Sequence, residues 1–563
     1  MSGIMRHAVG AAALPFQWIA GAFHGWMSGS QAVVDVTLTR VPDLVEREQQ
    51  LHRIRRMGND PNVAAILLRI EAPPGGYAAC QDLRGVIKAT RAAGTQVYAW
   101  LDAPGNATMW IASACDRVFV VPTTEIALVG VGTELTFFGA ALARLGLEPD
   151  FEAAGAYKSF GEPFTRSFAS PANQEALQQL VDDLHGQLIG DIAAERGRSQ
   201  QEMDAIISRA PVFAEDAMAS GLVDQLAYGD EVEDWIASHH GEAGTLIPFS
   251  TWRLRDRVLE RLDRFGDGGS IVSVVHMEGP IVMDDNGPST NIRARKIVPL
   301  LADLRKNDNV GAVVLHINSG GGSALASDLM WREVEQIQQV KPVVAIFEDV
   351  SASGGYYLAA PAAEIMARPG TLTGSIGVFG GKILAGEGMR KVGVHTQEIS
   401  AAPNANLYSP SKPFSDAQRG RFKASLQRVY DDFVAKVASG RKREQEDIEP
   451  HCRGRVWTGD AARERGLVDR HGDLQDAVER ARVLSGLHIG EYVRQDIDTR
   501  ASTVFSRWMG QALKQARPMG AMAHVAIQAT DRILGSRVLD ALDLISTHQS
   551  EVLALMPFDL DLR

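Results

Sequence analysis

Hydrophobic and polar residues follow two alternating patterns along this chain. Short apolar runs predict buried strands, and longer segments with apolar residues every three or four positions predict amphipathic helices. Strands that alternate with helices are typical of a mostly parallel sheet with helices on its faces. In the first half the predicted strands are Val33–Thr39, Val63–Ile70 and Gln96–Leu101, with helices at Val41–Arg56, Cys80–Ala93 and Thr108–Ala114. In the second half they are Ile271–His276, Ala312–Ile317 and Val343–Phe347, with a helix at Ala324–Gln339.

The second half repeats the first at a nearly fixed distance. Ala65-Ile-Leu-Leu-Arg-Ile70 matches Ala312-Val-Val-Leu-His-Ile317, which begins 247 residues later. Gly221-Leu-Val-Asp224 matches Gly466-Leu-Val-Asp469 at a distance of 245 residues. A register held over so long a stretch predicts a tandem duplication of one α/β unit.

The predicted organisation has five segments in 563 residues. They are an apolar N-terminal segment (1–30), an N-terminal repeat (31–240), a linker (241–270), a C-terminal repeat (271–486) and a helical tail (487–563). Each repeat is expected to end in a long helical block, at Asn173–Arg198 and Asp416–Ser439. Further helical spacing in the tail covers Val504–Ala516, Ala521–Leu534 and Ser536–Ala554.

The apolar segment Ala8–Phe23 leaves two interpretations open. It is shorter than the ~20 residues that a spanning helix needs, and Pro15 and Gln17 interrupt it. It is either a degenerate signal or anchor segment or an amphipathic helix lying at an interface.

Composition removes several classes of function. The formal net charge is −12 and no basic stripe stands out, which argues against a nucleic-acid partner. The three cysteines lie far apart, without metal-ligand spacing or a disulfide framework. No phosphate loop of the Gly-x-x-x-x-Gly-Lys type is present.

Ser353 lies at a predicted turn between strand Val343–Phe347 and a helix that begins near Tyr356. Gly354 and Gly355 follow it and allow backbone N–H groups to approach a substrate closely. A serine beside glycines also caps ordinary turns, so this corner alone does not define a nucleophile.

The two copies differ at the positions where chemistry is expected. At the repeat distance, Ser353 corresponds to Asn106 and Ser375 to Leu128. The glycine-rich loop Asn318–Ser323 corresponds to Glu71–Gly76, which lacks the run of three glycines. Lys158 in the first copy instead corresponds to Ala405. The polar groups are therefore divided between the copies.

A serine nucleophile needs a base. His316 precedes the glycine-rich loop and His395 follows Gly393, but neither has a matched acid in the sequence. A lysine can serve if burial lowers its pKa toward neutrality, and Lys158 lies between Tyr157 and Phe160.

The chain resembles the long, tandem-repeat (67K-type) form of the signal peptide peptidase A family, the serine–lysine peptidases of family S49. Ser351-Ala-Ser353-Gly-Gly-Tyr356 is similar to the nucleophile turn of that family, and Gly155–Phe164 to its general-base motif. Gly374-Ser375-Ile-Gly377 resembles the segment that orients the lysine, and Asn318–Ser323 resembles the oxyanion loop. The resemblance covers about residues 30–485.

The resemblance implies a role for each matching residue. Ser353 would be the nucleophile, Lys158 the general base and Ser375 the residue that orients the lysine. The backbone N–H groups of Gly322 and Gly354 would form the oxyanion hole. The expected reaction is hydrolysis of cleaved signal peptides or other short apolar peptides through an acyl-enzyme, with no cofactor or metal.

The resemblance also implies a ClpP/crotonase-like α/β superhelix in each repeat, a homotetramer and association with a bacterial cell membrane, on either the cytoplasmic or the periplasmic side. Two alternatives remain at this point. One is a crotonase-like acyl-CoA enzyme, and the other is an oligomeric scaffold with little catalytic activity.

Overall fold

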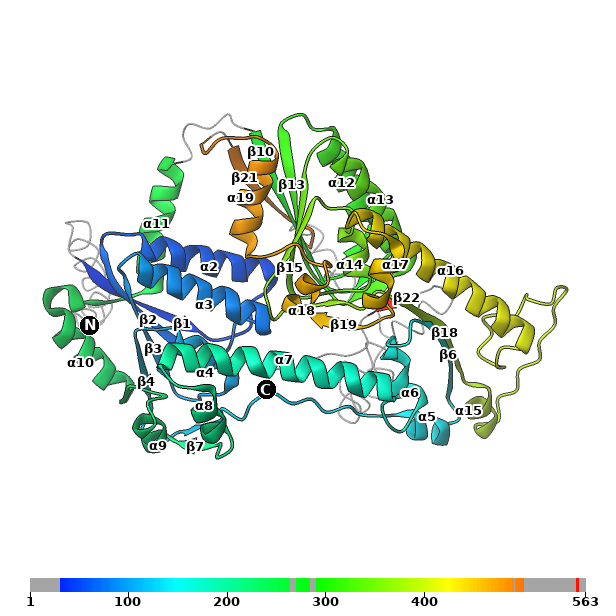
Figure 1. Ribbon diagram of the computed structural model, residues 1–563, viewed down its shortest axis with the longest axis horizontal. Coiled ribbons are helices and arrows are strands. Elements are labelled where there is room, and N and C mark those ends of the chain that lie inside the picture. The colour runs from blue at the N-terminus through cyan, green and yellow to red at the C-terminus, as the bar shows by residue number, and fades with distance from the viewer. Residues whose placement is uncertain (1–30, 264–269, 284–289, 491, 501–552, 556–563) are drawn as a thin grey trace, which may run out of the picture. The chain divides into compact units, whose positions relative to one another are not determined.

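The computed structural model describes residues 31–263, 270–283, 290–490, 492–500 and 553–555 (Figure 1). The segment Ala8–Phe23 and the tail helices expected at 504–516 and 521–534 lie outside the described residues. None of the helices in the described part of the chain combines the length and apolar character needed to cross a bilayer. The chain divides into two units, drawn mainly from residues 1–132 with 181–268 and from residues 133–180 with 269–560.

The first unit is built on a parallel sheet. Its strand order is β8 (Gln225–Leu226), β4 (Arg117–Val120), β3 (Gln96–Leu101), β2 (Val63–Ile70), β1 (Ala32–Leu38) and β9 (Leu246–Pro248). Alternate strand residues such as Val33 and Leu67 pack against Val232 and Ile236 of helix α10 (Gly229–His240). Helices α2 (Leu44–Gly58) and α3 (Tyr77–Ala92) pack against each other. The start of the predicted linker thus supplies a strand, followed by helix α11 (Phe249–Asp263).

The second unit repeats the same strand order. Its parallel strands are β20 (Arg470–His471), β16 (Glu364–Ala367), β15 (Val343–Ala352), β13 (Val310–Ser319), β10 (Ser270–Glu278) and β21 (Tyr492–Asp498). Strands β13 and β15 and helix α13 (Ala324–Gln338) each begin 247 residues after β2, β3 and α3. Helix α19 (Leu474–Leu484) packs on this sheet through Leu474, Ala477 and Val478. The predicted α/β duplication is confirmed.

A second sheet in this unit recruits a strand from the first half of the sequence. Its order is β12 (Ile292–Arg293), β11 (Ile281–Val282), β14 (Gly321–Ser323), β22 (Leu553–Leu555), β18 (Val378–Leu384) and β6 (Glu148–Ala154). Strand β6 pairs antiparallel with β18, from Val378 opposite Ala154 to Leu384 opposite Glu148. This pairing places Lys158, four residues beyond β6, in the unit that carries Ser353.

The structure contains the two long helices predicted at the ends of the repeats, and a strand where part of a tail helix was predicted. The blocks are confirmed as α7 (Pro171–Arg196) and α16 (Asp416–Gly440). The helix predicted at Ser536–Ala554 is wrong at its end, because Leu553 and Ala554 belong to strand β22. Apolar residues in a short run fit either element, and here pairing with two neighbouring strands selects the strand.

Candidate active site

Ser353 lies at a strained corner of the backbone. It follows β15 and immediately precedes helix α14 (Gly354–Ala359), and its φ of 54° with ψ of −113° is unusual for a residue with a side chain. Its N–H donates to the Gly374 carbonyl at 2.8 Å, and its own carbonyl accepts from the Tyr357 N–H at 2.8 Å. Such strain persists only where surrounding contacts fix the backbone, and it is concentrated at functional sites.

The three side chains that the resemblance selected meet in the interior of the second unit. The Lys158 Nζ lies 2.8 Å from the Ser353 Oγ, 2.9 Å from the Ser375 Oγ and 2.9 Å from the Ser375 carbonyl oxygen. All three residues are buried, Lys158 with 5% of its surface exposed. The Lys158 amine is therefore within hydrogen-bond distance of both serine hydroxyls, although Lys158 and Ser375 are 217 residues apart in sequence.

Burial sets the protonation state of this lysine. It lowers the pKa of Lys158 well below its usual value, and no nearby carboxylate contributes a compensating effect. A neutral amine has two N–H donors and one lone pair. The two oxygens of Ser375 can accept both N–H groups, which leaves the lone pair directed at the Ser353 hydroxyl. The geometry therefore fits an uncharged amine able to accept a proton from Ser353.

A short segment, Arg453–Arg455, holds the lysine and Ser375 in place. The Arg453 carbonyl accepts from the Tyr157 N–H at 2.8 Å, and the Arg455 carbonyl accepts from the Ser375 N–H at 2.7 Å. Gly454 packs so closely against the lysine that a Cβ there would lie 2.6 Å from the backbone nitrogen of Lys158. Sequence reasoning missed this segment.

Gly322 and Gly354 lie against each other beside Ser353. A Cβ on Gly354 would come within 3.2 Å of the Gly322 nitrogen and 2.6 Å of the Ser327 Oγ. A Cβ on Gly322 would overlap the Ile281 carbonyl oxygen at 1.9 Å. Both positions therefore require glycine, and the two backbone segments that could hold an oxyanion are packed together.

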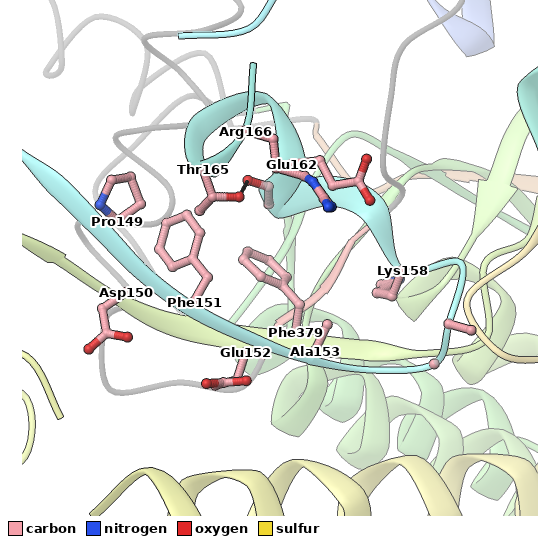
Figure 2. Close-up of a pocket in the computed structure, with 13 residues that line it drawn as sticks. Pro149, Asp150, Phe151, Glu152, Ala153, Lys158, Glu162, Thr165, Arg166 and Phe379 are labelled. Atoms are coloured by element: carbon pink, nitrogen blue, oxygen red, sulfur yellow. Dashed lines mark hydrogen bonds between the residues drawn. The ribbon is translucent and has the colours of Figure 1, made fainter. Parts of the chain in front are cut away.

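A cavity of about 520 Å³ opens beside Lys158 (Figure 2). The rings of Phe151 and Phe379 point into it from the antiparallel strands β6 and β18, and Asp150 and Glu152 point away on the other side of β6. Helix α6 (Glu162–Thr165) forms the opposite wall. The floor beside the lysine is therefore apolar.

The histidines do not join the serine. His316 lies 2.5 Å from Glu348 through Nε2 and 2.8 Å from His276 through Nδ1, and His276 in turn lies 2.8 Å from Asp496. This row, buried except for Asp496, crosses four neighbouring strands and was not predicted. His395 is exposed. Within the described residues, no group of three or more His, Cys, Asp or Glu side chains has an arrangement that could hold a metal ion.

The corresponding corner of the first unit is closed by an amide. The Asn106 side chain donates to the Gly130 carbonyl at 2.8 Å and accepts from the Gly130 N–H at 3.1 Å. Asn106 occupies the repeat position of Ser353, so the first copy has a structural contact where the second has a hydroxyl.

Comparison with known proteins identifies the class as serine peptidase. The chain is 28% identical over 449 residues to "Serine protease SPPA, chloroplastic" of Arabidopsis thaliana, covering 79% of this chain and 66%, just under two thirds, of that protein. It is 30% identical over 492 residues to "Protease 4" of Salmonella typhi, covering 85% of this chain and 77% of that protein. A mutant ClpP1 from Listeria monocytogenes is similar in structure at 16% identity and a TM-score of 0.25, over 36% of this chain and 94% of that one.

The family is shown directly. The profile of peptidase family S49 matches residues 89–242 and again residues 335–488, once in each half. The chain belongs to peptidase family S49.

The depressed pKa of Lys158 predicts a pH-dependent stability penalty. Between that depressed pKa and the ordinary lysine value of about 10.4, the unfolded chain binds a proton that the folded chain does not. The free energy of unfolding should therefore rise with pH across this window, by up to about 1.4 kcal/mol per pH unit. We expect Lys158→Met to be more stable than the unchanged chain near pH 7, with a difference that shrinks toward pH 10, as measured by denaturant unfolding.

The exposed Lys412 provides the matched control, because its side chain is 70% exposed. Lys412→Met should leave the pH dependence unchanged. A Lys158→Met difference that stays constant with pH would contradict a depressed lysine pKa.

The contact between Gly454 and Lys158 predicts a selective loss of activity. Gly454→Ala would push against the lysine backbone, and an error of about 1 Å in a reacting group can reduce activity about 100-fold. Gly393 has a similar φ, 83° against 79°, but a Cβ there would meet nothing within 4 Å. We expect both variants to lose stability in thermal unfolding, Gly454→Ala more because its Cβ also meets the Lys158 backbone, but only Gly454→Ala to lose peptidase activity. Equal activities would show that this contact does not position the lysine.

Proposed function

We propose that the protein is a serine endopeptidase that uses a Ser353–Lys158 dyad to cleave short apolar peptides, such as cleaved signal peptides. The observation that carries this proposal is the buried, uncompensated Lys158 amine 2.8 Å from the Ser353 Oγ. Membership of family S49 supports peptide hydrolysis over the alternative of acyl-CoA chemistry.

The first step follows from the lone pair on the neutral amine. Lys158 accepts the proton of the Ser353 hydroxyl as its oxygen attacks the peptide carbonyl. Ser375 accepts two hydrogen bonds from Nζ, and these contacts keep the lone pair directed at the hydroxyl. Because no carboxylate stabilises the ammonium, the protonated lysine readily passes its proton to the leaving amine.

The charge on the carbonyl oxygen needs donors that are already in place. The N–H groups of Gly322 and Gly354 are proposed to bind this oxyanion, a type of contact worth about 3–4 kcal/mol in other enzymes. The step leaves an acyl-enzyme on Ser353, and Lys158 then activates a water molecule that hydrolyses the ester. The chain's own residues supply every proton transfer in this sequence.

The preference for apolar substrates rests on the cavity beside the lysine. Phe151 and Phe379 form its floor, so a substrate side chain placed there would lose contact with water against aromatic rings. A branched or aromatic side chain would gain about 1.5–3 kcal/mol from full burial.

The larger organisation is also part of the proposal. We propose that residues 31–240 and 271–486 act as two repeats joined by residues 241–270, that the chain forms a homotetramer, and that it works at a bacterial membrane surface. The tail from 487 to 563, whose described parts include strands β21 and β22 and which was expected to be helical, would belong to this assembly rather than to a separate catalytic domain.

Substitutions at the three polar residues test the dyad. Ser353→Ala should abolish both cleavage of an apolar fluorogenic peptide and acylation by a fluorophosphonate probe, read by intact mass. Lys158→Ala should lower kcat/KM about 100- to 10,000-fold, the range for a general base. Ser375→Ala removes one hydrogen bond to the amine and should lower it about tenfold.

Ser351 offers a matched control two residues from Ser353. It is equally buried, and its Oγ has no hydrogen-bond partner among the described residues. Ser351→Ala should therefore keep full activity and label normally. Retention of most activity by Lys158→Ala would exclude the dyad, and labelling without any peptide cleavage would favour the scaffold alternative.

A further inference from the structure

The Arg455 side chain lies beside the active site and contacts two aromatic rings and one helix. Its guanidinium carbon is 4.7 Å from the centre of the Tyr157 ring and 4.6 Å from the centre of the Trp457 ring. Its terminal nitrogens donate to the Glu175 Oε1 at 2.6 Å and to the Gln179 Oε1 at 2.5 Å, both on helix α7. Only 12% of the side chain is exposed. The guanidinium is therefore held in one place by several contacts.

The Tyr157 ring belongs to the turn that carries Lys158. This turn follows β6 and lies beyond the ladder of β6 and β18, which ends at Ala154. The Tyr157 hydroxyl donates at 3.3 Å to the same Glu175 carboxylate that accepts from Arg455. Because a guanidinium is attracted to the face of an aromatic ring, this contact limits where the turn can place the lysine.

The Trp457 ring belongs to a strand that supports Ser375. Trp457 lies in β19 (Val456–Thr458), which pairs antiparallel with β17 (Leu372–Gly374), and β17 ends one residue before Ser375. The backbone of Arg455 also reaches this serine, because its carbonyl accepts from the Ser375 N–H at 2.7 Å. Arg455 therefore contacts the lysine turn through its side chain and Ser375 through its backbone.

We propose that the Arg455 side chain is a positioning residue that fixes the direction of the Lys158 lone pair. The proposal rests on the proposed function, because this direction matters only if Lys158 accepts the proton of Ser353. The amine donates its two hydrogens to Ser375, so its lone pair points at Ser353 only while the lysine turn and Ser375 keep their relative position. Arg455 holds that relative position, and it acts on the reaction through Tyr157 and Ser375.

A positioning role has a recognisable kinetic signature. A displaced amine slows proton removal in the transition state, so kcat falls, and an error of about 1 Å can cost about 100-fold. The aromatic floor of the cavity comes from β6 and β18, whose pairing ends before the lysine turn, so KM should change little. An equal fall in kcat and in kcat/KM marks the loss of an interaction made only in the transition state.

A second arginine on the same tryptophan makes the test specific. Arg465 lies over the Trp457 ring at 3.9 Å, and its hydrogen bonds go to residues one and four positions away. Arg455→Met and Arg465→Met each remove a guanidinium from this ring, and the first also removes one from Tyr157. Arg455→Lys keeps the charge without the planar fork. In full-length protein, kcat and KM are measured with an apolar fluorogenic peptide, and thermal unfolding is measured on the same samples.

We expect Arg455→Met to lower kcat about 10- to 100-fold with KM changed less than about twofold, and Arg465→Met to keep kcat within about twofold of the unchanged chain. Arg455→Lys should fall between them. Tyr157→Leu removes the ring that Arg455 contacts and should lower kcat to a similar extent. The double variant Arg455→Met/Tyr157→Leu should fall no further than the more affected single variant, because both changes act through one contact.

Four outcomes would overturn the positioning role while leaving the dyad in place. They are an unchanged kcat in Arg455→Met, equal losses in Arg455→Met and Arg465→Met, a rise in KM without a fall in kcat, and additive losses in the double variant. If Arg455→Met fails to fold, Arg455→Lys and Tyr157→Leu decide by the same outcomes. Full activity of Lys158→Ala in the same assay would overturn the proposed function together with this inference.

Discussion

An uncharged lysine amine, buried without a counter-ion, is the constraint on which the active site depends. An ammonium group in this position would lose its hydration without gaining a carboxylate, so the folded chain favours the neutral form. The same contacts that accept the two N–H groups also direct the lone pair, because both acceptors belong to Ser375. The burial that makes the Lys158 amine costly to charge is therefore also the feature on which its proposed role as a base depends.

Holding such an amine requires rigid backbone on every side. Lys158 comes from the turn that follows β6, Ser353 from the residue after β15, and Ser375 from the residue after β17 (Leu372–Gly374). These three parts of the chain are far apart in sequence, and the pairing of β6 with β18 brings them together. In addition, the Arg453 carbonyl accepts a hydrogen bond from the Tyr157 N–H and the Arg455 carbonyl accepts one from the Ser375 N–H. Positive φ values at both Ser353 and Ser375 show how closely the backbone is constrained here.

The sequence could predict the parts of the structure that depend on local pattern. Strands such as Val63–Ile70 and Gln96–Leu101 were predicted to the residue, because apolar runs and repeat register both mark them. The meeting of Lys158 with Ser353 had to be carried over from a family resemblance, because it depends on antiparallel pairing between segments more than 200 residues apart. The row of Asp496, His276, His316 and Glu348 escaped notice for the same reason, since each residue comes from a different strand. Strand β22 was mistaken for helix because three residues carry too little pattern, and its conformation is set by its neighbours.

The two copies show that the strand-to-helix corner is a structural element in both units, and catalysis is proposed for only one of them. In both units the corner follows the strand at the same place in the same strand order. In the first, Asn106 closes it by exchanging two hydrogen bonds with Gly130. In the second, the equivalent of Gly130 is Gly377, which packs against Gly454 and the Ala154 carbonyl and so helps hold β6 in place. The same glycine position thus forms hydrogen bonds with an asparagine side chain in one copy. In the other copy it packs against the end of the strand that leads into Lys158. The repeat thus contains two equivalent corners, and strand β6 brings a lysine only to the corner for which catalysis is proposed.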